Sequence, residues 1–131
     1  MNFNTLPLYE KNVTFLEMAR AGNLALLEKL FEAGADLDYQ DDLLGNTALT
    51  LAALEGHPDL VKYLLSKRAN LDKENTAGNT ALIIASAQGR IKVVQMLLSH
   101  GVGLNHANKE GDTALTVAAF QGCLAVVQAL L

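Results

Sequence analysis

One five-residue pattern recurs three times along the chain at a constant spacing. A glycine, an Asn or Asp, a threonine, an alanine and a leucine begin at residues 45, 78 and 111, so the pattern returns every 33 residues. Other positions keep the same step, namely the alanines 52, 85 and 118, the glycines 56, 89 and 122, and the leucines 64, 97 and 130. A fixed period of this length indicates a solenoid in which each unit packs on the next.

Within one unit, local signals predict two helices joined by a tight turn. Thr47 can cap a first helix over residues 48–55 through its hydroxyl, and Gly56 suits the left-handed turn that ends it. Pro58 fits the first turn of a second helix. That helix carries apolar residues at 60, 61, 64 and 65, which form one buried stripe. The polar stretch that follows is long enough for an extended hairpin tip.

Residues 12–41 match the same plan in degenerate form, with one residue inserted in the tip between Leu37 and Gly45. At the other end Leu131 aligns with Leu98, which lies inside a second helix, so the last unit is cut short and has an apolar finish. The predicted organisation is an N-terminal extension and four units, at residues 1–11, 12–41, 42–74, 75–107 and 108–131.

These units resemble ankyrin repeats. The resemblance rests on the 33-residue period, the Gly-Asn-Thr-Ala-Leu opening, Ala52-Ala53, Gly56-His57 and the Val61-x-x-Leu64-Leu65 segment. It implies an all-α solenoid of about four stacked helix-turn-helix units with β-hairpin tips. It also implies a concave surface that binds other proteins.

Two departures from the family pattern concern stability. The family's Thr-Pro-Leu-His appears as Thr-Ala-Leu-Thr or Thr-Ala-Leu-Ile, so Thr50 and Thr116 could replace the hydrogen bonds that the histidine makes between repeats only partly, and Ile83 not at all. Arg68 stands where other units have Gly34 and Gly101, in a turn that favours positive φ, and should cost about 1 kcal/mol there.

Charge is unevenly distributed. The net charge is −4, and residues 10–45 hold eight acidic and three basic residues. No basic stripe is present to follow a phosphate backbone, which argues against nucleic acid as a partner. No stretch approaches the roughly 18 apolar residues of a membrane span, and the first residues lack the features of a signal peptide. We therefore expect no membrane partner and a cytoplasmic location.

No residue pattern indicates catalysis, a metal or a cofactor. His57, His100, His106 and Cys123 form no ligand pair. His57 holds the usual Gly-His place of a repeat, which favours a structural role, and the other two histidines are expected in solvent. The aspartates at 36, 38, 41 and 42 vaguely resemble a calcium loop, but Asp41 occupies the position where such a loop needs glycine. A solvated acidic tip is the favoured interpretation.

Equivalent residues of successive units line up as ladders. The positions just before each first-helix glycine give two of them, which by resemblance face the groove. Leu54 and Phe120 are apolar there, and Leu43 and Leu44 occupy the acidic first tip; these leucines and Phe120 either bind a partner or pack on the stack. The candidate partner-binding residues are Arg20, Leu43, Leu44, Asn46, Leu54, Glu55, Asn79, Ala87, Gln88, Asp112, Phe120 and Gln121.

The expected function is a protein–protein interaction module that binds another protein through its groove and tips, as an inhibitor or regulator. Two alternatives stay open, a recognition segment of a larger multidomain protein that bears an enzyme, and an architectural repeat spacer. We expect a monomer in which self-association is possible through the uncapped C-terminal repeat.

Overall fold

A computed structural model describes residues 2–131, and these residues contain α-helices, one short 3-10 helix at Phe3–Thr5 and no β-strand. The helices are α1 (Leu8–Ala21), α2 (Leu24–Glu32), α3 (Ala48–Glu55), α4 (Pro58–Ser66), α5 (Ala81–Ala87), α6 (Ile91–Ser99), α7 (Ala114–Gln121) and α8 (Leu124–Leu130).

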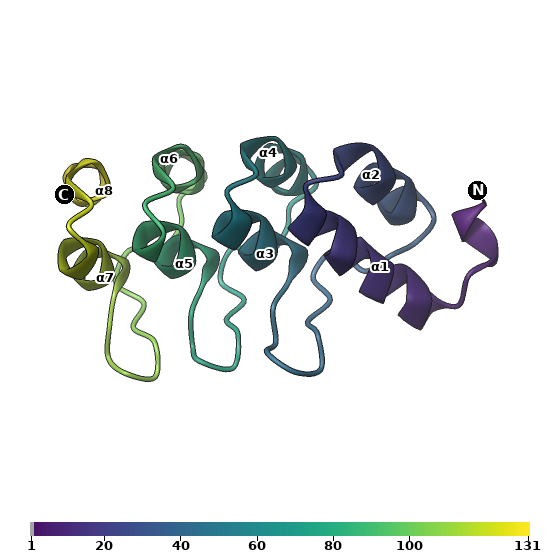
Figure 1. Ribbon diagram of the computed structural model, residues 1–131, viewed down its shortest axis with the longest axis horizontal. Coiled ribbons are helices and arrows are strands. Elements are labelled where there is room, and N and C mark those ends of the chain that lie inside the picture. Colours follow the sequence, from purple (N-terminus) through teal and green to yellow (C-terminus); the bar gives the residue numbers. More distant parts are fainter. Residues whose placement is uncertain (1) are drawn as a thin grey trace.

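The helices form two parallel rows, with the loops between units extending to one side (Figure 1). The first helices α1, α3, α5 and α7 contact one another in order, and each also contacts the second helix of its own unit. The predicted all-helical solenoid is therefore confirmed. The first helix begins at Leu8, so it extends into the segment that the sequence set apart as an N-terminal extension.

Threonine hydroxyl caps begin α3, α5 and α7, as predicted at Thr47. The Thr47 hydroxyl accepts from the Thr50 amide at 3.2 Å, and the Thr50 hydroxyl accepts from the Thr47 amide at 2.8 Å. Thr113 and Thr116 repeat this reciprocal cap. The two threonines that stand in place of the family histidine therefore bond within their own units, and the partial replacement between repeats that we expected from them is not observed.

Small and branched apolar side chains form the core. The repeated alanines Ala52, Ala85 and Ala118 are fully buried, which lets successive first helices approach closely. The predicted stripe on α4 is buried as well, at Leu60, Val61, Leu64 and Leu65. Phe3 is buried at the N-terminal end. No helix within residues 2–131 has the length and apolar character that crossing a bilayer requires.

Consecutive units are also joined away from the tips, at the turns between first and second helices. His57 Nε2 donates to the Arg20 carbonyl at 3.0 Å, and Arg90 Nη2 donates to the Leu54 carbonyl at 3.2 Å. Both side chains lie over the glycine that ends the preceding first helix. The structural role predicted for His57 is confirmed, and Cys123 occupies the same position one unit further along, against Gly89.

Each tip is a tight turn rather than a two-stranded hairpin. In the first tip, the Asp41 amide donates to the Asn46 carbonyl at 3.0 Å. The Asp41 carboxylate accepts from the amides of residues 43, 44, 45 and 46, at 2.6 to 3.1 Å. Asn75 and Asn108 hold the equivalent turns in the later tips with one side-chain oxygen each. Side-chain caps thus replace strand pairing.

Arg68 has φ 67° and is the only residue other than glycine with a positive φ within residues 2–131. The left-handed backbone predicted there is confirmed. Arg68→Gly should raise the melting temperature by about 3 °C, because removing about 1 kcal/mol of strain is partly offset by the greater chain entropy of glycine. Thermal unfolding followed by circular dichroism measures this change.

The matched control is Gly101→Arg. Gly101 has φ 75°, and no atom lies within 4 Å of the place that a β-carbon would take there, so the substitution adds backbone strain without a steric clash. It should lower the melting temperature by about the amount that Arg68→Gly raises it. A melting temperature of Arg68→Gly equal to or below that of the wild type would contradict the strain assigned to residue 68.

The Asp41 turn makes stability depend on pH. Partial burial acts to raise the pKa of the Asp41 carboxyl, but the four backbone amides outweigh it and leave this pKa below its ordinary value. A lowered folded-state pKa stabilises the fold above about pH 4, and this stability is lost as the pH falls through the folded value. Asp41→Asn should therefore lower the melting temperature more at pH 6 than at pH 3.

Asp72→Asn is the control for this pH series, because the Asp72 side chain accepts no hydrogen bond from residues 2–131. Its melting temperature should follow that of the wild type at both pH values. An Asp41→Asn effect of equal size at pH 6 and pH 3 would show that the ionised carboxylate does not hold the first tip.

Candidate protein-binding surface

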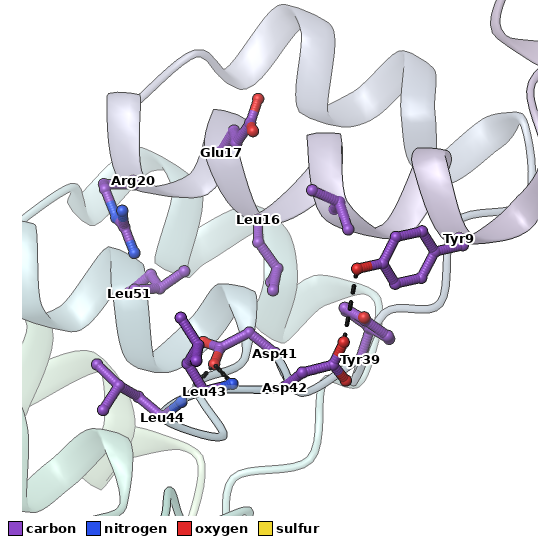
Figure 2. A pocket seen from close by; sticks show the side chains of 11 residues that line it. Tyr9, Leu16, Glu17, Arg20, Tyr39, Asp41, Asp42, Leu43, Leu44 and Leu51 are labelled. Atoms are coloured by element: carbon purple, nitrogen blue, oxygen red, sulfur yellow. Dashed lines mark hydrogen bonds between the residues drawn. The ribbon is translucent and has the colours of Figure 1, made fainter.

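Two hollows lie between the first helices and the tips. The larger, here called the N-terminal hollow, has a volume of about 280 Å³ and lies between α1 and the first tip (Figure 2). The second, here called the central hollow, has a volume of about 260 Å³ and lies between α3, α5, α7 and the later tips. Both lie on the side where the family resemblance led us to expect a groove. Three of the candidate residues line the N-terminal hollow, namely Arg20, Leu43 and Leu44. Five line the central hollow, namely Asn46, Leu54, Asn79, Ala87 and Gln88.

The floor of the N-terminal hollow is apolar. Val13 and Leu16 come from α1 and Leu51 from α3, and the first tip adds Leu43 and Leu44 as a wall. Leu43 is 88% exposed and Leu44 58% exposed. Both leucines therefore face solvent, and the alternative in which they fold back onto the stack is wrong. The Asp41 carboxylate turns the chain at this point and so holds the two leucines outward.

One end of this hollow carries two tyrosines and a carboxylate. Tyr9 donates from its hydroxyl to Asp42 Oδ2 at 3.5 Å, and Tyr39 lies beside them (Figure 2). Partial burial raises the pKa of the Tyr39 phenol, and the nearby charges of Asp42, Tyr9 and Asp41 raise it further. We call Tyr9, Tyr39 and Asp42 the Asp42 corner. Arg20 lies at the other end of the hollow, beside Leu51.

The Asp42 corner and the contribution of α1 to the hollow were missed in the sequence analysis. A signal was present, because residues 9, 13, 16 and 20 follow the i, i+4, i+7 spacing of one helical face. The predicted division at residue 11 separates Tyr9 from this face, so the face is not predicted from the sequence. Once α1 begins at Leu8, Tyr9 and Val13 share the face that holds Leu16 and Arg20 toward the tip.

The central hollow is more polar. Leu54 is half-buried and packs against the core. Part of this side chain therefore packs on the stack, and only the remainder faces solvent. Ala87 is half-buried, and Gln88 is exposed. The floor is completed by Ile83, Ile84 and Val117.

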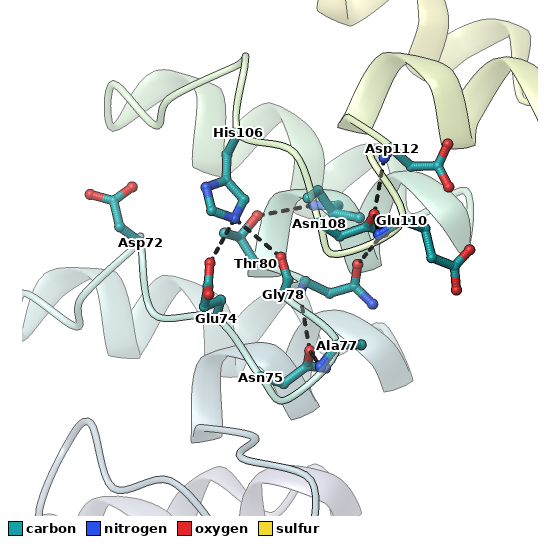
Figure 3. A network of polar contacts seen from close by, with 12 residues as sticks. Asp72, Glu74, Asn75, Ala77, Gly78, Thr80, His106, Asn108, Glu110 and Asp112 are labelled. Carbon is teal, nitrogen blue, oxygen red and sulfur yellow. Dashed lines mark hydrogen bonds and ion pairs between the residues drawn. The ribbon is translucent and has the colours of Figure 1, made fainter.

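Consecutive tips are joined by a ladder of asparagine side chains (Figure 3). Asn75 Nδ2 donates to Asn46 Oδ1 at 3.3 Å, and Asn108 Nδ2 donates to Asn79 Oδ1 at 2.9 Å. Backbone amides of residues 76 and 109 add bonds to the carbonyls of residues 44 and 77. The buried Asn46 is thus occupied in holding the next tip. Asp112, which has no following tip in this chain, accepts from the Thr116 hydroxyl at 3.5 Å.

His106 also belongs to this ladder. Its Nε2 lies 2.8 Å from a Glu74 carboxylate oxygen and 3.1 Å from the Gly78 carbonyl oxygen. His106 is exposed to solvent as expected, with 38% of its side chain accessible, but it also makes these two contacts. Its imidazole ties the last tip to the preceding one, and the sequence held no signal for this, because the two residues are brought together only by stacking.

The remaining candidate residues lie outside both hollows. Phe120 lies near the end of α7 and is 89% exposed. Glu55 and Gln121 are exposed, and Asp112 is half-buried.

The titratable side chains of residues 2–131 form no group of three that could hold a metal ion. Of the aspartates compared with a calcium loop, Asp36 accepts from the Asp38 amide, and Asp38 accepts from the Asn70 amide of the next unit. Asp41 is committed to its turn. These carboxylates stabilise loops.

Several characterised proteins share part of this sequence. "Ankyrin repeat, SAM and basic leucine zipper domain-containing protein 1" of Equus caballus is 39% identical over 71 residues, which are 53% of this chain and 15% of that protein. "Ankyrin repeat and SOCS box protein 6" of Mus musculus is 33% identical over 71 residues, or 53% of this chain and 17% of that protein. "Protein phosphatase 1 regulatory subunit 27" of Homo sapiens is 39% identical over 59 residues, or 45% of this chain and 38% of that protein.

This chain therefore corresponds to well under half the length of each of these relatives, whose names describe repeat or regulatory proteins. The family model "Ankyrin repeats (3 copies)" matches residues 15–107 and again residues 77–131. With the 33-residue period and the stacked helix pairs, this match shows that the chain belongs to the ankyrin-repeat family.

Proposed function

We propose that this chain is a protein–protein interaction module that binds its partner through the two hollows and the tips. The observation that carries the proposal is the exposure of Leu43, Leu44 and Phe120 on the side where the tips and first helices meet. Leaving large apolar side chains in water has a cost in free energy, and exposed apolar patches of this kind mark contact surfaces.

The ladder of Arg20, Leu54, Ala87 and Phe120 runs along the same side. Phe120 supports the proposal most strongly, since an exposed aromatic ring is an effective interface anchor. Polar positions beside the ladder would form the rim, and these are Glu55, Gln88 and Gln121. The residues Asn46, Asn79 and Asp112 would act indirectly, by setting the positions of the tips.

A regulatory role, in which the bound module covers its target, is part of the proposal. One relative is named as a regulatory subunit of a phosphatase, and that description belongs to the relative. The division into units at residues 12–41, 42–74, 75–107 and 108–131 is likewise retained as a proposal, supported by the four helix pairs. A cytoplasmic location and a monomeric state also stay predictions.

The double variant Leu44→Asp with Phe120→Asp should keep the fold and weaken partner binding at least tenfold, because two apolar contacts become charged. Both side chains are mostly exposed. Leu54 is not substituted, because it is half-buried against the core, and a charge there would lower stability as well as binding. Affinity capture from the native cells with wild-type and variant baits, followed by mass spectrometry and calorimetry on the captured protein, measures the effect.

The matched control is Gln95→Asp with Gln128→Asp. It adds the same two negative charges at exposed positions of α6 and α8, in the row of second helices. This control should retain the partner of the wild type. If the Leu44/Phe120 double variant retains the same partner with unchanged affinity, the proposed surface is wrong.

A second candidate is the recognition segment of a larger protein. It is favoured by the relatives, whose names include SAM, leucine zipper and SOCS box parts that lie beyond ankyrin repeats. An antibody against the 131-residue chain separates the two on a blot of native cells, since a band well above the size of this chain supports the second candidate. The third interpretation, an architectural spacer, predicts that no partner is lost with the Leu44/Phe120 double variant.

A further inference from the structure

The N-terminal hollow has a size that suits one or two side chains of a peptide. Its volume of about 280 Å³ lies at the lower limit of small-molecule pockets, which begin at roughly 300 Å³. It is bounded by a helix on one side and a rigid tip on the other (Figure 2). Its floor of Val13, Leu16 and Leu51 offers no polar group that would orient a cofactor, but it can bury an aliphatic or aromatic side chain.

The Asp42 corner is suited to a cation. The rings of Tyr9 and Tyr39 both line the hollow, and Tyr9 is 60% exposed. An ammonium or guanidinium group is attracted to the face of a tyrosine ring, and more strongly where a carboxylate lies beside it. Asp42 supplies that carboxylate, because its side chain has no hydrogen bond from residues 2–131 other than the long one from the Tyr9 hydroxyl.

No basic side chain of residues 2–131 fills this corner. His106 with Glu74 is the only ion pair in that part of the chain, so neither Asp42 nor Glu17 has a cationic partner there. Lys11, the basic residue next to Tyr9 along α1, donates to the Ala33 carbonyl at 2.8 Å instead. The hollow is lined by the carboxylates of Glu17, Asp41 and Asp42 and by the single cation Arg20, which favours a negative potential at the end away from Arg20.

Arg20 makes the two ends of the hollow unequal. It lies beside Leu51, at the end opposite Tyr9 (Figure 2). A cationic residue of a partner would be repelled there and attracted at the Asp42 corner. The hollow can therefore distinguish the direction of a bound segment as well as its composition.

We propose that the N-terminal hollow binds a linear segment of the partner protein that buries one bulky apolar side chain against Val13, Leu16 and Leu51 and sets a Lys or Arg into the Asp42 corner. This inference rests on the proposed function and specifies the partner chemistry at one end of the groove. The basic residue lies on one side of the apolar anchor only, since Arg20 occupies the other end.

The test begins with a displayed library of random 12-residue peptides selected against the intact 131-residue chain. The expected result is enrichment of sequences with a bulky apolar residue and a Lys or Arg a fixed few positions to one side of it. The best of these is then synthesised for calorimetry. Replacing its apolar residue with Ser, or its basic residue with Gln, should raise its dissociation constant at least tenfold.

Variants of the protein locate the contact. Asp42→Asn, which removes only the charge, and Tyr9→Leu, which removes the aromatic ring but keeps an apolar side chain, should each raise the dissociation constant of that peptide at least fivefold. Asp72→Asn removes the same charge from an exposed loop position outside the hollow and should change it less than twofold. Raising the salt concentration should weaken binding to the wild type more than to Asp42→Asn, because the exposed charge is screened.

Enrichment of acidic or uncharged peptides, failure of any peptide to enrich, or equal effects of Asp42→Asn and Asp72→Asn would each overturn the inference. These outcomes differ from failure of the proposed function. A native partner that is lost with Leu44→Asp and Phe120→Asp but binds Asp42→Asn normally would preserve the interaction module while removing this assignment of its partner chemistry.

Discussion

Close contact between successive first helices supports every other feature of this protein. Ala52, Ala85 and Ala118 are fully buried where α3, α5 and α7 meet, and a larger side chain there would force the units apart. The spacing that these alanines set is the spacing at which Asn75 reaches Asn46 and His57 reaches the Arg20 carbonyl. Packing of the alanines therefore sets the spacing of the units. The hydrogen bonds from Asn75 on one side of the stack and from His57 on the other then fix how each unit is aligned with the next.

Hydrogen bonds between the tips take the place of the bonds between repeats that the family histidine makes. Threonines stand in place of the family histidine and are used within their own helix starts, while Asn75, Asn108 and His106 supply side-chain bonds between the tips of neighbouring units. Holding the tips by side-chain caps rather than by strand pairing leaves their outer residues free. Leu43 and Leu44 can stay in solvent because the Asp41 carboxylate, and not their own burial, determines the turn.

The two hollows differ in a way that divides their roles. The central hollow is lined by ladder asparagines and by the half-buried Leu54, so its shape is tied to the stability of the stack. The outer residues of the N-terminal hollow, such as Tyr9, Asp42, Leu43 and Leu44, are exposed, so their substitution leaves the stack intact, whereas only floor residues such as Leu16 and Leu51 belong to the core. Residues that recognise a partner can therefore vary more freely at that end.

The repeat period by itself determined the fold, the bounds of α3, the buried stripe of α4 and the left-handed backbone of Arg68, because each follows from local chemistry that recurs at one step. Only the tertiary structure decided that Tyr9 joins Tyr39 and Asp42, that His106 meets Glu74, and that Asn46 is buried. Those contacts join residues about 30 apart along the chain, and their side chains meet only because one unit stacks on the next.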